Sequence, residues 1–256
     1  MAQLPEFVGL LLLGEEEQFL GSAFPISEAH RLYLGAGHTI PADRRDELRI
    51  AIQNPSGRLE FTKVLAVEVL DGQPDVVVLE AEDGRPPYLP LAADPAFIWE
   101  GVSAAGYPER DIREVESGER IPGIRGLAGT VTRKVEADEE LGVNGPAYEV
   151  SFAIPAGMSG GPVLSMRLGY PLGLIGVCLG NVWVTSYVSG EVEEIHGEQR
   201  VIRQETQKIE YGIVANLHRS AESRIALVDR SLAEVIGSQA ATPDAHQMGR
   251  AAESQG

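Results

Sequence analysis

The chain has one cysteine, few basic residues and no long apolar run. Because Cys178 is the only cysteine among 256 residues, no disulfide can form within the chain. A fold without disulfides is compatible with a reducing compartment. Near the amino terminus, an apolar run of seven residues ends at Glu15 with no basic segment before it, unlike a membrane span or a secretory signal. We expect a cytoplasmic protein, although a chain whose leader had been removed would begin in the same way.

Positive charge is scarce as well. Thirty-eight acidic residues face 21 basic ones, which gives a formal net charge of −17 at pH 7. Such a field repels phosphate groups, so we expect neither nucleic acid nor an anionic membrane as a partner. The alternative to a functional role for this negative charge is that it keeps the protein soluble. No His, Cys or Asp cluster has metal-ligand spacing and no nucleotide-binding fingerprint is present, so we expect no metal and no cofactor.

Short apolar segments rich in β-branched residues recur along the chain. Gly, Pro, Asp and Asn separate them at intervals of about ten residues, a spacing typical of an all-β sandwich or barrel. The polar stretch 108–128 is interpreted as the connection between two β units, and 189–208 as an extended hairpin or insertion. Examples of the apolar segments are 48–53, 61–70, 75–80, 147–154 and 182–188.

The carboxyl-terminal region predicts one helix and a tail. Ser220 suits an N-cap and Gly237 suits the end of a helix. Apolar residues recur between them at steps of three and four: Ile225, Val228, Leu232 and Val235. We expect an amphipathic helix over 220–237, packed on a barrel. Residues 238–256 have no periodicity and are expected to form a disordered tail.

The stretch IPAGMSGGP, residues 154–162, surrounds one serine with glycine. Gly157, Gly160 and Gly161 permit backbone conformations and close approaches that a side chain would block. If the N–H groups of Gly157 and Ser159 point into one hollow, they can stabilise the developing oxyanion of acyl transfer. A serine is a poor nucleophile without a base beside it. The structural alternative is a tight surface turn.

Two upstream residues supply a base and an orienting carboxylate. His38 follows an apolar strand and a Gly-Ala-Gly turn, and Asp75 begins a strand of three valines. A carboxylate at the head of a buried strand is costly unless it is paired. A histidine N–H is a suitable partner, and the pair would hold the imidazole in the tautomer that accepts a serine proton. Taken singly, each residue has an alternative explanation: His38 could be a structural histidine, and Asp75 could be a turn residue.

The order His38, Asp75, Ser159, together with the phrases GSAF, AGH, DVVVLE, GYP and GMSGGPVL, resembles trypsin-like serine peptidases of the chymotrypsin fold. The disulfide-free bacterial and HtrA-type members are the most similar. The resemblance runs from about residue 6 to residue 237. It implies two antiparallel six-stranded β-barrels, about 6–107 and 121–217, with the active-site cleft between them and a carboxyl-terminal helix. It makes His38 the general base, Asp75 its orienter, Ser159 the nucleophile, and Gly157 with Ser159 the oxyanion-hole donors.

The same resemblance implies where a substrate lies. The strand 176–181 would pair with the substrate backbone, and Ala153 would stand at the base of the specificity pocket, where trypsin carries an aspartate. A preference for Lys or Arg at P1 is therefore unsupported. Met158 replaces an aspartate that grips a freshly cleaved amino terminus, and Leu179 replaces a serine that often bonds the catalytic aspartate. The substrate-binding candidates are Ala153, Cys178, Leu179, Gly180 and Asn181.

The sequence thus predicts a serine endopeptidase that cleaves protein or peptide substrates through an acyl-enzyme. GMSGG also fits an esterase nucleophile elbow, but Gly160-Gly161-Pro162 is hostile to the helix which that architecture needs after its serine. The other alternative is a catalytically latent or inactive chymotrypsin-fold module that binds a protein partner. A further hypothesis is that 189–208 gates the cleft or docks a regulatory protein, the alternative being a solvated hairpin.

Overall fold

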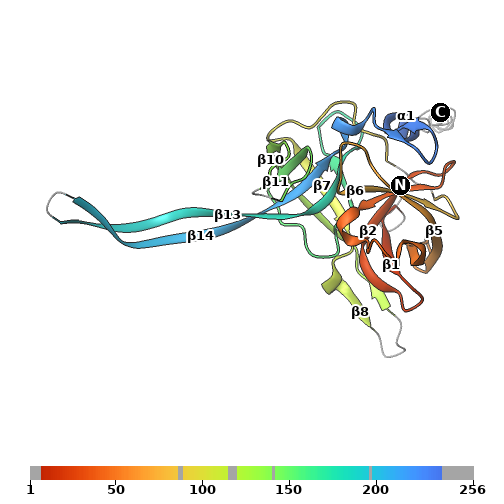
Figure 1. Ribbon diagram of the computed structural model, residues 1–256, viewed down its shortest axis with the longest axis horizontal. Coiled ribbons are helices and arrows are strands. Elements are labelled where there is room, and N and C mark those ends of the chain that lie inside the picture. The colour runs from red at the N-terminus through yellow and green to blue at the C-terminus, as the bar shows by residue number, and fades with distance from the viewer. Residues whose placement is uncertain (1–6, 86–88, 115–119, 140–141, 196–197, 238–256) are drawn as a thin grey trace, which may run out of the picture.

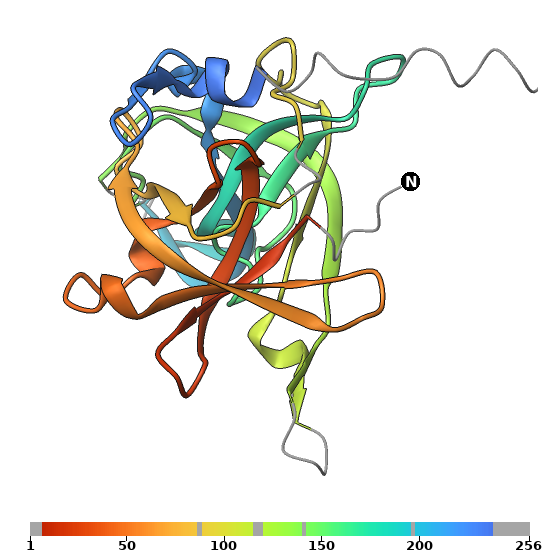
Figure 2. The same cartoon turned by 90° about the vertical axis from the view of Figure 1, so that its right-hand side faces the viewer.

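The computed structural model describes residues 7–85, 89–114, 120–139, 142–195 and 198–237. Twelve of its strands form two closed antiparallel barrels of six strands each, which confirms the predicted all-β, two-barrel architecture (Figure 1). The first barrel has the order β1-β2-β3-β6-β5-β4 and faces the viewer in Figure 2. Its strands are β1 (Gly9–Leu13), β2 (Gln18–Ser27), β3 (Leu32–Ala36), β4 (Leu48–Gln53), β5 (Leu59–Val69) and β6 (Val76–Ala81).

The second barrel has the order β10-β11-β14-β13-β12-β7. Its strands are β7 (Gly101–Gly106), β10 (Arg125–Val135), β11 (Ala147–Val150), β12 (Pro162–Ser165), β13 (Gly173–Ile195) and β14 (Glu198–Asn216).

Strand β1 shows why the apolar run near the amino terminus does not alternate with polar residues. Side chains of successive strand residues point to opposite faces. Leu11 and Leu13 lie in the core of the first barrel, while Leu10 and Leu12 pack in another cluster with Ala105 of the second barrel. Both faces of β1 are buried, so both must be apolar.

The boundary between the barrels differs from the prediction, which ended the first barrel near residue 107. Strand β7 belongs to the second barrel, where Gly106 lies opposite Arg125 of β10. The chain therefore crosses between barrels after β6 and before β7, not within 108–128. That polar stretch contains the 3₁₀ turn η4 (Glu109–Asp111), the short hairpin of β8 (Ile112–Glu114) and β9 (Arg120–Pro122), and the start of β10. Its polarity reflects a projecting hairpin instead of a linker (Figure 1).

The predicted helix over 220–237 is also wrong in length. The segment holds the end of η5 (Leu217–Ser220), a small hairpin of β15 (Arg224–Ile225) and β16 (Arg230–Ser231), and then α1 (Leu232–Gly237). The carboxylate of Glu68 accepts the backbone N–H groups of Ala226 and Leu227, and Asp229 has a φ of +58°, which a helix interior does not tolerate. Ser231 and Glu234 exchange backbone-to-side-chain bonds as a capping box, so the helix begins there.

Buried apolar side chains from both barrels and from this carboxyl-terminal segment form one cluster. Phe24 and Ile26 come from the first barrel, Leu174 and Val177 from the second, and α1 adds residues such as Val235. Of the periodic apolar residues that suggested a long helix, Leu232 and Val235 are buried from α1, Ile225 is buried from β15, and Val228 is half-buried outside any helix. The predicted tail, 238–256, lies outside the described residues.

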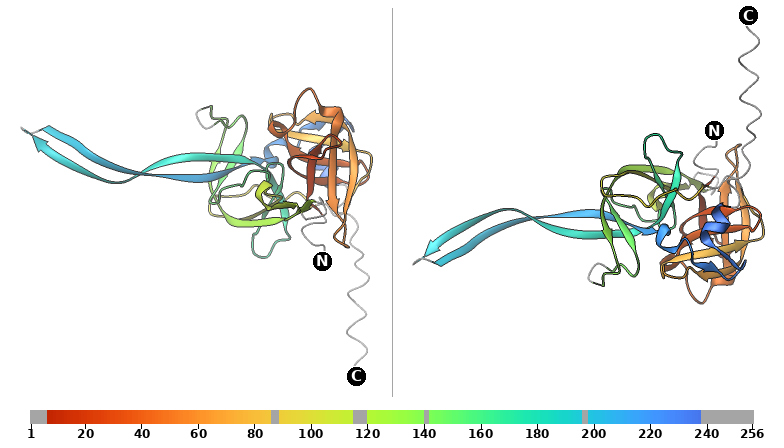
Figure 3. Two further views of the ribbon diagram at one scale, coloured as in Figure 1. Left: turned by 90° about the horizontal axis from the view of Figure 1, so that it is seen from below. Right: turned by 90° about the horizontal axis from the view of Figure 1, so that it is seen from above.

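Strands β13 and β14 continue far beyond the barrel as a two-stranded ribbon. Their pairing runs from Gly176 opposite Asn216 to Ile195 opposite Glu198. The ribbon leaves the second barrel on the side away from the first barrel (Figures 1 and 3). The prediction of an extended hairpin over 189–208 is confirmed, and the hairpin begins earlier than expected. Within the described residues, no helix has the length and hydropathy to cross a membrane.

Candidate active site

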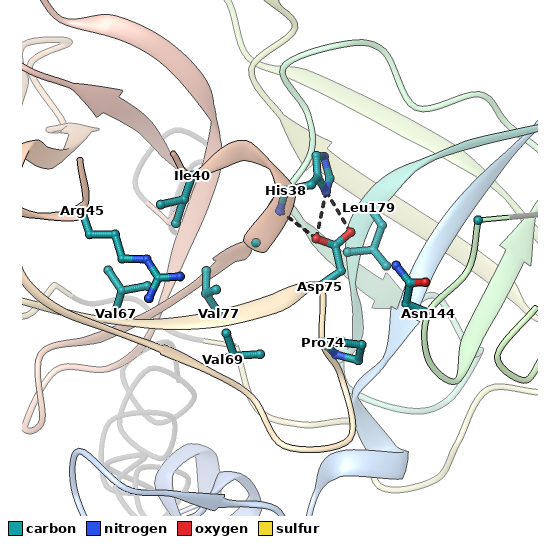
Figure 4. Close-up of a pocket in the computed structure, with 12 residues that line it drawn as sticks. His38, Ile40, Arg45, Val67, Val69, Pro74, Asp75, Val77, Asn144 and Leu179 are labelled. Carbon is teal, nitrogen blue, oxygen red and sulfur yellow. Dashed lines mark hydrogen bonds and ion pairs between the residues drawn. The ribbon is translucent and has the colours of Figure 1, made fainter. Parts of the chain in front are cut away.

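His38 and Asp75 lie at the ends of two neighbouring strands of the first barrel. Ala36, the last residue of β3, is paired with Val76, the first residue of β6, so the residues just beyond them meet. The carboxylate of Asp75 accepts the backbone N–H of His38 at 2.8 Å and contacts Nδ1 of the ring at 2.8 and 3.0 Å. The expected pairing of these two side chains is therefore present. Figure 4 shows the pair at the edge of a cavity.

Ser159 stands in the loop before β12, in the second barrel, and backbone contacts from two directions hold it. Its carbonyl accepts the N–H of Ser22 at 2.7 Å, and Gly160 donates to the carbonyl of Cys178 at 2.7 Å. Gly160 has a φ of +87°, and a Cβ there would lie 1.9 Å from the carbonyl oxygen of Ser22. Glycine is needed at this position because the loop presses directly against the backbone of the first barrel.

The segment before Ser159 forms a tight turn. Met158 donates to the carbonyl of Pro155 at 3.0 Å, and Gly157 has a φ of +92°, the geometry of a type II turn with glycine in its third position. The N–H of Glu109 donates to the carbonyl of Ala156 at 2.9 Å. Since C=O and N–H point in opposite directions in a trans peptide, the N–H of Gly157 points away from Glu109.

The backbone N–H groups of Gly157 and Ser159 have no acceptor among the described residues. Both belong to the glycine-rich loop, two residues apart. Met158 between them is fully buried in the core of the second barrel.

The Ser159 hydroxyl donates to the carbonyl of Leu179 at 3.0 Å. In the described part of the chain, no hydrogen bond joins it to His38. The structure thus brings His38 and Asp75 into contact and places Ser159 next to the substrate-binding candidate strand.

Four of the substrate-binding candidates, Cys178 to Asn181, lie along β13. Cys178 is the least accessible of them. Its side chain is fully buried, and burial raises the pKa of its thiol to about 12. Its N–H donates to the carbonyl of Gly161 at 2.8 Å, and its own carbonyl is bound to Gly160. The part of β13 that is open to a substrate backbone therefore begins at Leu179 and continues through Gly180.

Asn181 closes the space between β13 and the segment before the serine. Its side-chain oxygen accepts the N–H of Ile154 at 2.6 Å, and its amide nitrogen donates to the Ile154 carbonyl at 2.8 Å. Ile154 is 2% exposed. A Cβ added at Gly212 would lie 2.9 Å from the Ile154 side chain, so Ile154 is closely packed against β14. Ala153, the expected base of the specificity pocket, precedes Ile154 and is partly buried.

A cavity of about 540 Å³ is lined in part by the His38–Asp75 pair and also reaches Leu179 and Asn144 (Figure 4). Its walls include the apolar side chains of Ile40, Val67 and Val69, and the side chain of Arg45 reaches into it. Among the described residues, no group of three or more His, Cys, Asp or Glu side chains could hold a metal ion.

A family model of the trypsin-like peptidase domain matches residues 21–174, which include His38, Asp75 and Ser159. The chain belongs to this family. Membership makes it a peptidase domain, and peptidases are hydrolases. No curated protein sequence matches the chain.

Solved structures with the same fold include Rv3671c of M. tuberculosis. The inactive form of its serine-to-alanine mutant is 17% identical with a TM-score of 0.52, covering 92% of this chain and 89% of that one. The active form of the Rv3671c protease is 18% identical with a TM-score of 0.52, covering 85% and 78% of the two chains. At this identity the likeness bears on the fold alone.

Ser22, in the stretch GSAF, lies against the loop of Ser159, and the sequence predicts no role for it. It is fully buried. Its hydroxyl donates to the carbonyl of Gly157 at 2.9 Å and accepts the N–H of Tyr107 at 3.0 Å. Together with the backbone bond to Ser159, this side chain connects β2 of the first barrel to the carbonyls of Gly157 and Ser159. Only the fold brings these segments together, so no local signal marks the residue.

We predict that Ser22→Ala lowers the free energy of unfolding by about 1–3 kcal/mol, because it leaves the buried N–H of Tyr107 without its acceptor. Urea unfolding of the peptidase measures the change. Ser56→Ala is the matched control: its hydroxyl is exposed and bonds Asn54, so a change within about 0.5 kcal/mol is expected. Equal effects of the two substitutions would contradict this role of Ser22.

Proposed function

We propose that this peptidase domain is a serine endopeptidase in which Ser159 is the nucleophile, His38 the base and Asp75 its orienter. The contact between the Asp75 carboxylate and Nδ1 of His38 is the observation that carries the proposal. An Nδ1–H bonded to a carboxylate leaves Nε2 as the acceptor, the tautomer that can take a proton from a serine. The second bond, from the backbone N–H of His38, holds the carboxylate in place.

The reaction follows the ordinary course of acyl transfer. Oγ of Ser159 attacks the carbonyl carbon of the substrate while its proton passes to Nε2 of His38. The tetrahedral intermediate collapses, the C–N bond breaks, and the leaving amine takes that proton. Water then attacks the acyl-enzyme with His38 again as base, which releases the acid and restores the serine.

The two unpaired N–H groups of Gly157 and Ser159 are the proposed oxyanion hole. Donors fixed before the reaction stabilise the charge that develops on the substrate oxygen. The bond from Glu109 to the Ala156 carbonyl supports this assignment, because it holds the Ala156–Gly157 peptide with its N–H on the free side. Rotating that peptide by half a turn would place a carbonyl where the donor is needed.

The resting position of the Ser159 hydroxyl bears on how the enzyme starts. An extended peptide beside β13 would donate its own N–H to the Leu179 carbonyl and so displace the hydroxyl toward His38. Hydrogen bonds in free enzymes often tighten only when substrate binds. The same contact favours the second candidate function, a latent or inactive module that binds a protein partner, if nothing displaces the hydroxyl.

The closed space beside Asn181 supports a small residue at P1. Ile154 and the Asn181 amide occupy the region between the turn and β13 in which a large P1 side chain would have to lie. Alanine or glycine at P1 needs no such room. The cavity beside His38 and Asp75, whose walls include the apolar side chains of Ile40, Val67 and Val69, suits an apolar side chain of a neighbouring substrate residue.

Replacing the nucleophile tests the proposal as a whole. Ser159→Ala should lower kcat by about 10⁴ or more, because the covalent route is lost. Labelling with a fluorophosphonate probe should be rapid for the wild type and absent for Ser159→Ala and His38→Ala. A wild type that labels no faster than these variants would reject the endopeptidase in favour of the latent module.

Glu109→Pro tests the oxyanion hole. Pro108 has φ −64° and ψ 134°, which suit a residue before proline, and position 109 opens a 3₁₀ turn, where proline is tolerated. The proline removes the N–H donor and sets its ring against the Ala156 carbonyl, so the peptide must rotate. We expect kcat to fall about 10²–10³-fold with little change in KM. Glu109→Ala, which keeps the N–H, is the control, and a kcat equal in both variants would contradict the assignment.

Enlarging the closed space tests the P1 preference. The wild type should hydrolyse peptides with alanine at P1 better than those with leucine. In Asn181→Gly combined with Ile154→Ala, the ratio of kcat/KM for leucine over alanine should rise by about tenfold or more, since a pocket for extra methylene groups is worth about 1–3 kcal/mol. An unchanged ratio would show that P1 is bound elsewhere.

A further inference from the structure

The outer edge of β13 is unpaired beyond the catalytic loop. On one side, β13 pairs with β14 from Gly176 as far as Ile195. On the other side, its pairing with β12 ends at Val177, opposite Pro162. In the portion of the chain that is described, no strand pairs with this second edge after Val177. An unpaired edge offers a row of N–H and C=O groups to any strand that can lie beside it.

This edge is continuous with the active site. It begins at Leu179, whose carbonyl binds the hydroxyl of Ser159. From there β13 continues as one strand into the ribbon, with a register shift between Tyr187 and Ser189, and the ribbon projects clear of both barrels (Figures 1 and 3). The ribbon therefore does not cover the site, as a gate would, but extends the strand that leads away from it. A lone two-stranded ribbon is marginally stable in water and gains from a third strand.

We propose that the ribbon is a docking strand for the substrate. The segment that precedes the scissile bond adds to the outer edge of β13 as a third strand, from Leu179 outward. This proposal rests on the function proposed above. Its occupant is an extended stretch of polypeptide, not a folded domain, because strand addition requires free backbone groups.

The direction of the added strand follows from the position of the nucleophile. The attacked carbonyl must lie at Ser159, beside Leu179, so the preceding residues of the substrate run past Asn181, Trp183 and Thr185 in turn. The substrate chain then runs opposite to β13, and the pair is antiparallel. At about 3.3 Å per residue, the edge from Leu179 to Ile195 offers roughly 50 Å for such pairing.

Side chains on the near part of the ribbon suit this use. Trp183 is 59% exposed and Val184 is 38% exposed, and as successive strand residues they face opposite sides of the ribbon. Cross-strand neighbours of this kind stabilise an added strand through aromatic and β-branched pairs. Backbone pairing itself tolerates many sequences, so the ribbon selects substrates that are unfolded for many residues before the cleavage site.

The test uses peptides of different lengths with one cleavage site. The shortest is acetyl-Thr-Gln-Thr-Ala linked to aminomethylcoumarin, and longer ones add four or eight alternating threonine and glutamine residues at the amino end. We expect KM to fall by about tenfold or more from the shortest to the longest peptide with kcat unchanged, since the added contacts form equally in the ground and transition states. Two sets of the longest peptide, each with N-methyl groups on alternate added residues, supply the control. One set removes the N–H groups on one edge of the added strand, and the other set removes those on the opposite edge. Only the set that removes N–H groups facing β13 should lose the gain.

A shortened ribbon completes the test. Thr185 and Lys208 lie opposite each other, so an Asn-Gly turn can replace residues 186–207 without disturbing the barrel. This variant should hydrolyse the shortest peptide as the wild type does and gain little from longer ones. An equal gain with length in both proteins would overturn the proposal, as would no gain in either. Failure of the wild type to hydrolyse the shortest peptide and to label with fluorophosphonate would instead count against the proposed function.

The competing occupant is a second copy of the chain. Analytical ultracentrifugation of the wild type and the shortened variant distinguishes it. A monomeric wild type supports the ribbon as a substrate strand. A dimer that requires the ribbon and a KM that does not depend on peptide length would overturn the proposal and make the ribbon an interface between copies.

Discussion

The apolar cluster between the two barrels is the constraint on which the site depends. His38 and Asp75 come from the first barrel and Ser159 from the second, so the proposed chemistry requires the barrels to be fixed relative to each other. Burial of side chains such as Phe24 and Val177 against α1 does this without directional bonds. Ser22 supplies directional hydrogen bonds across the same interface, because its backbone N–H and its hydroxyl both donate to the loop of Ser159.

The glycine-rich loop illustrates how close packing and chemistry coincide. At Gly160 a side chain would collide with the backbone of β2, and at Gly157 the positive φ turns a peptide so that its N–H is free. The loop therefore presents bare backbone for two reasons, the approach of the other barrel and the exposure of donors. Glu109 and Ser22 bind carbonyls of the same loop, whereas the N–H groups of Gly157 and Ser159 have no acceptor among the described residues.

Much of this arrangement could be predicted from the sequence. The short apolar segments predict the strands, and the local surroundings of His38, Asp75 and Ser159 are enough to name the residues of the proposed site, since each signal lies within a few positions. The role of Ser22 and of the Glu109 backbone could not be predicted, because their partners lie far away in the chain. The boundary between the barrels and the length of the final helix were wrong for a related reason. The pattern of polar and apolar residues indicates which residues are buried, but not which backbone conformation buries them. At 220–231 the backbone is a hairpin, held by the bond from Ala226 to Glu68 and turned at the positive φ of Asp229.

The carboxyl-terminal position of α1 has a consequence for the order of events during synthesis. The first barrel is complete once residue 81 has been made, so His38 and Asp75 can pair early. The interface that brings Ser159 to them includes Ile225, Leu232 and Val235, which are made after the strands of both barrels. If the proposed function holds, competence depends on contacts of high sequence separation that form after both barrels have been synthesised. A chain synthesised only as far as the second barrel carries all three proposed catalytic side chains without these contacts.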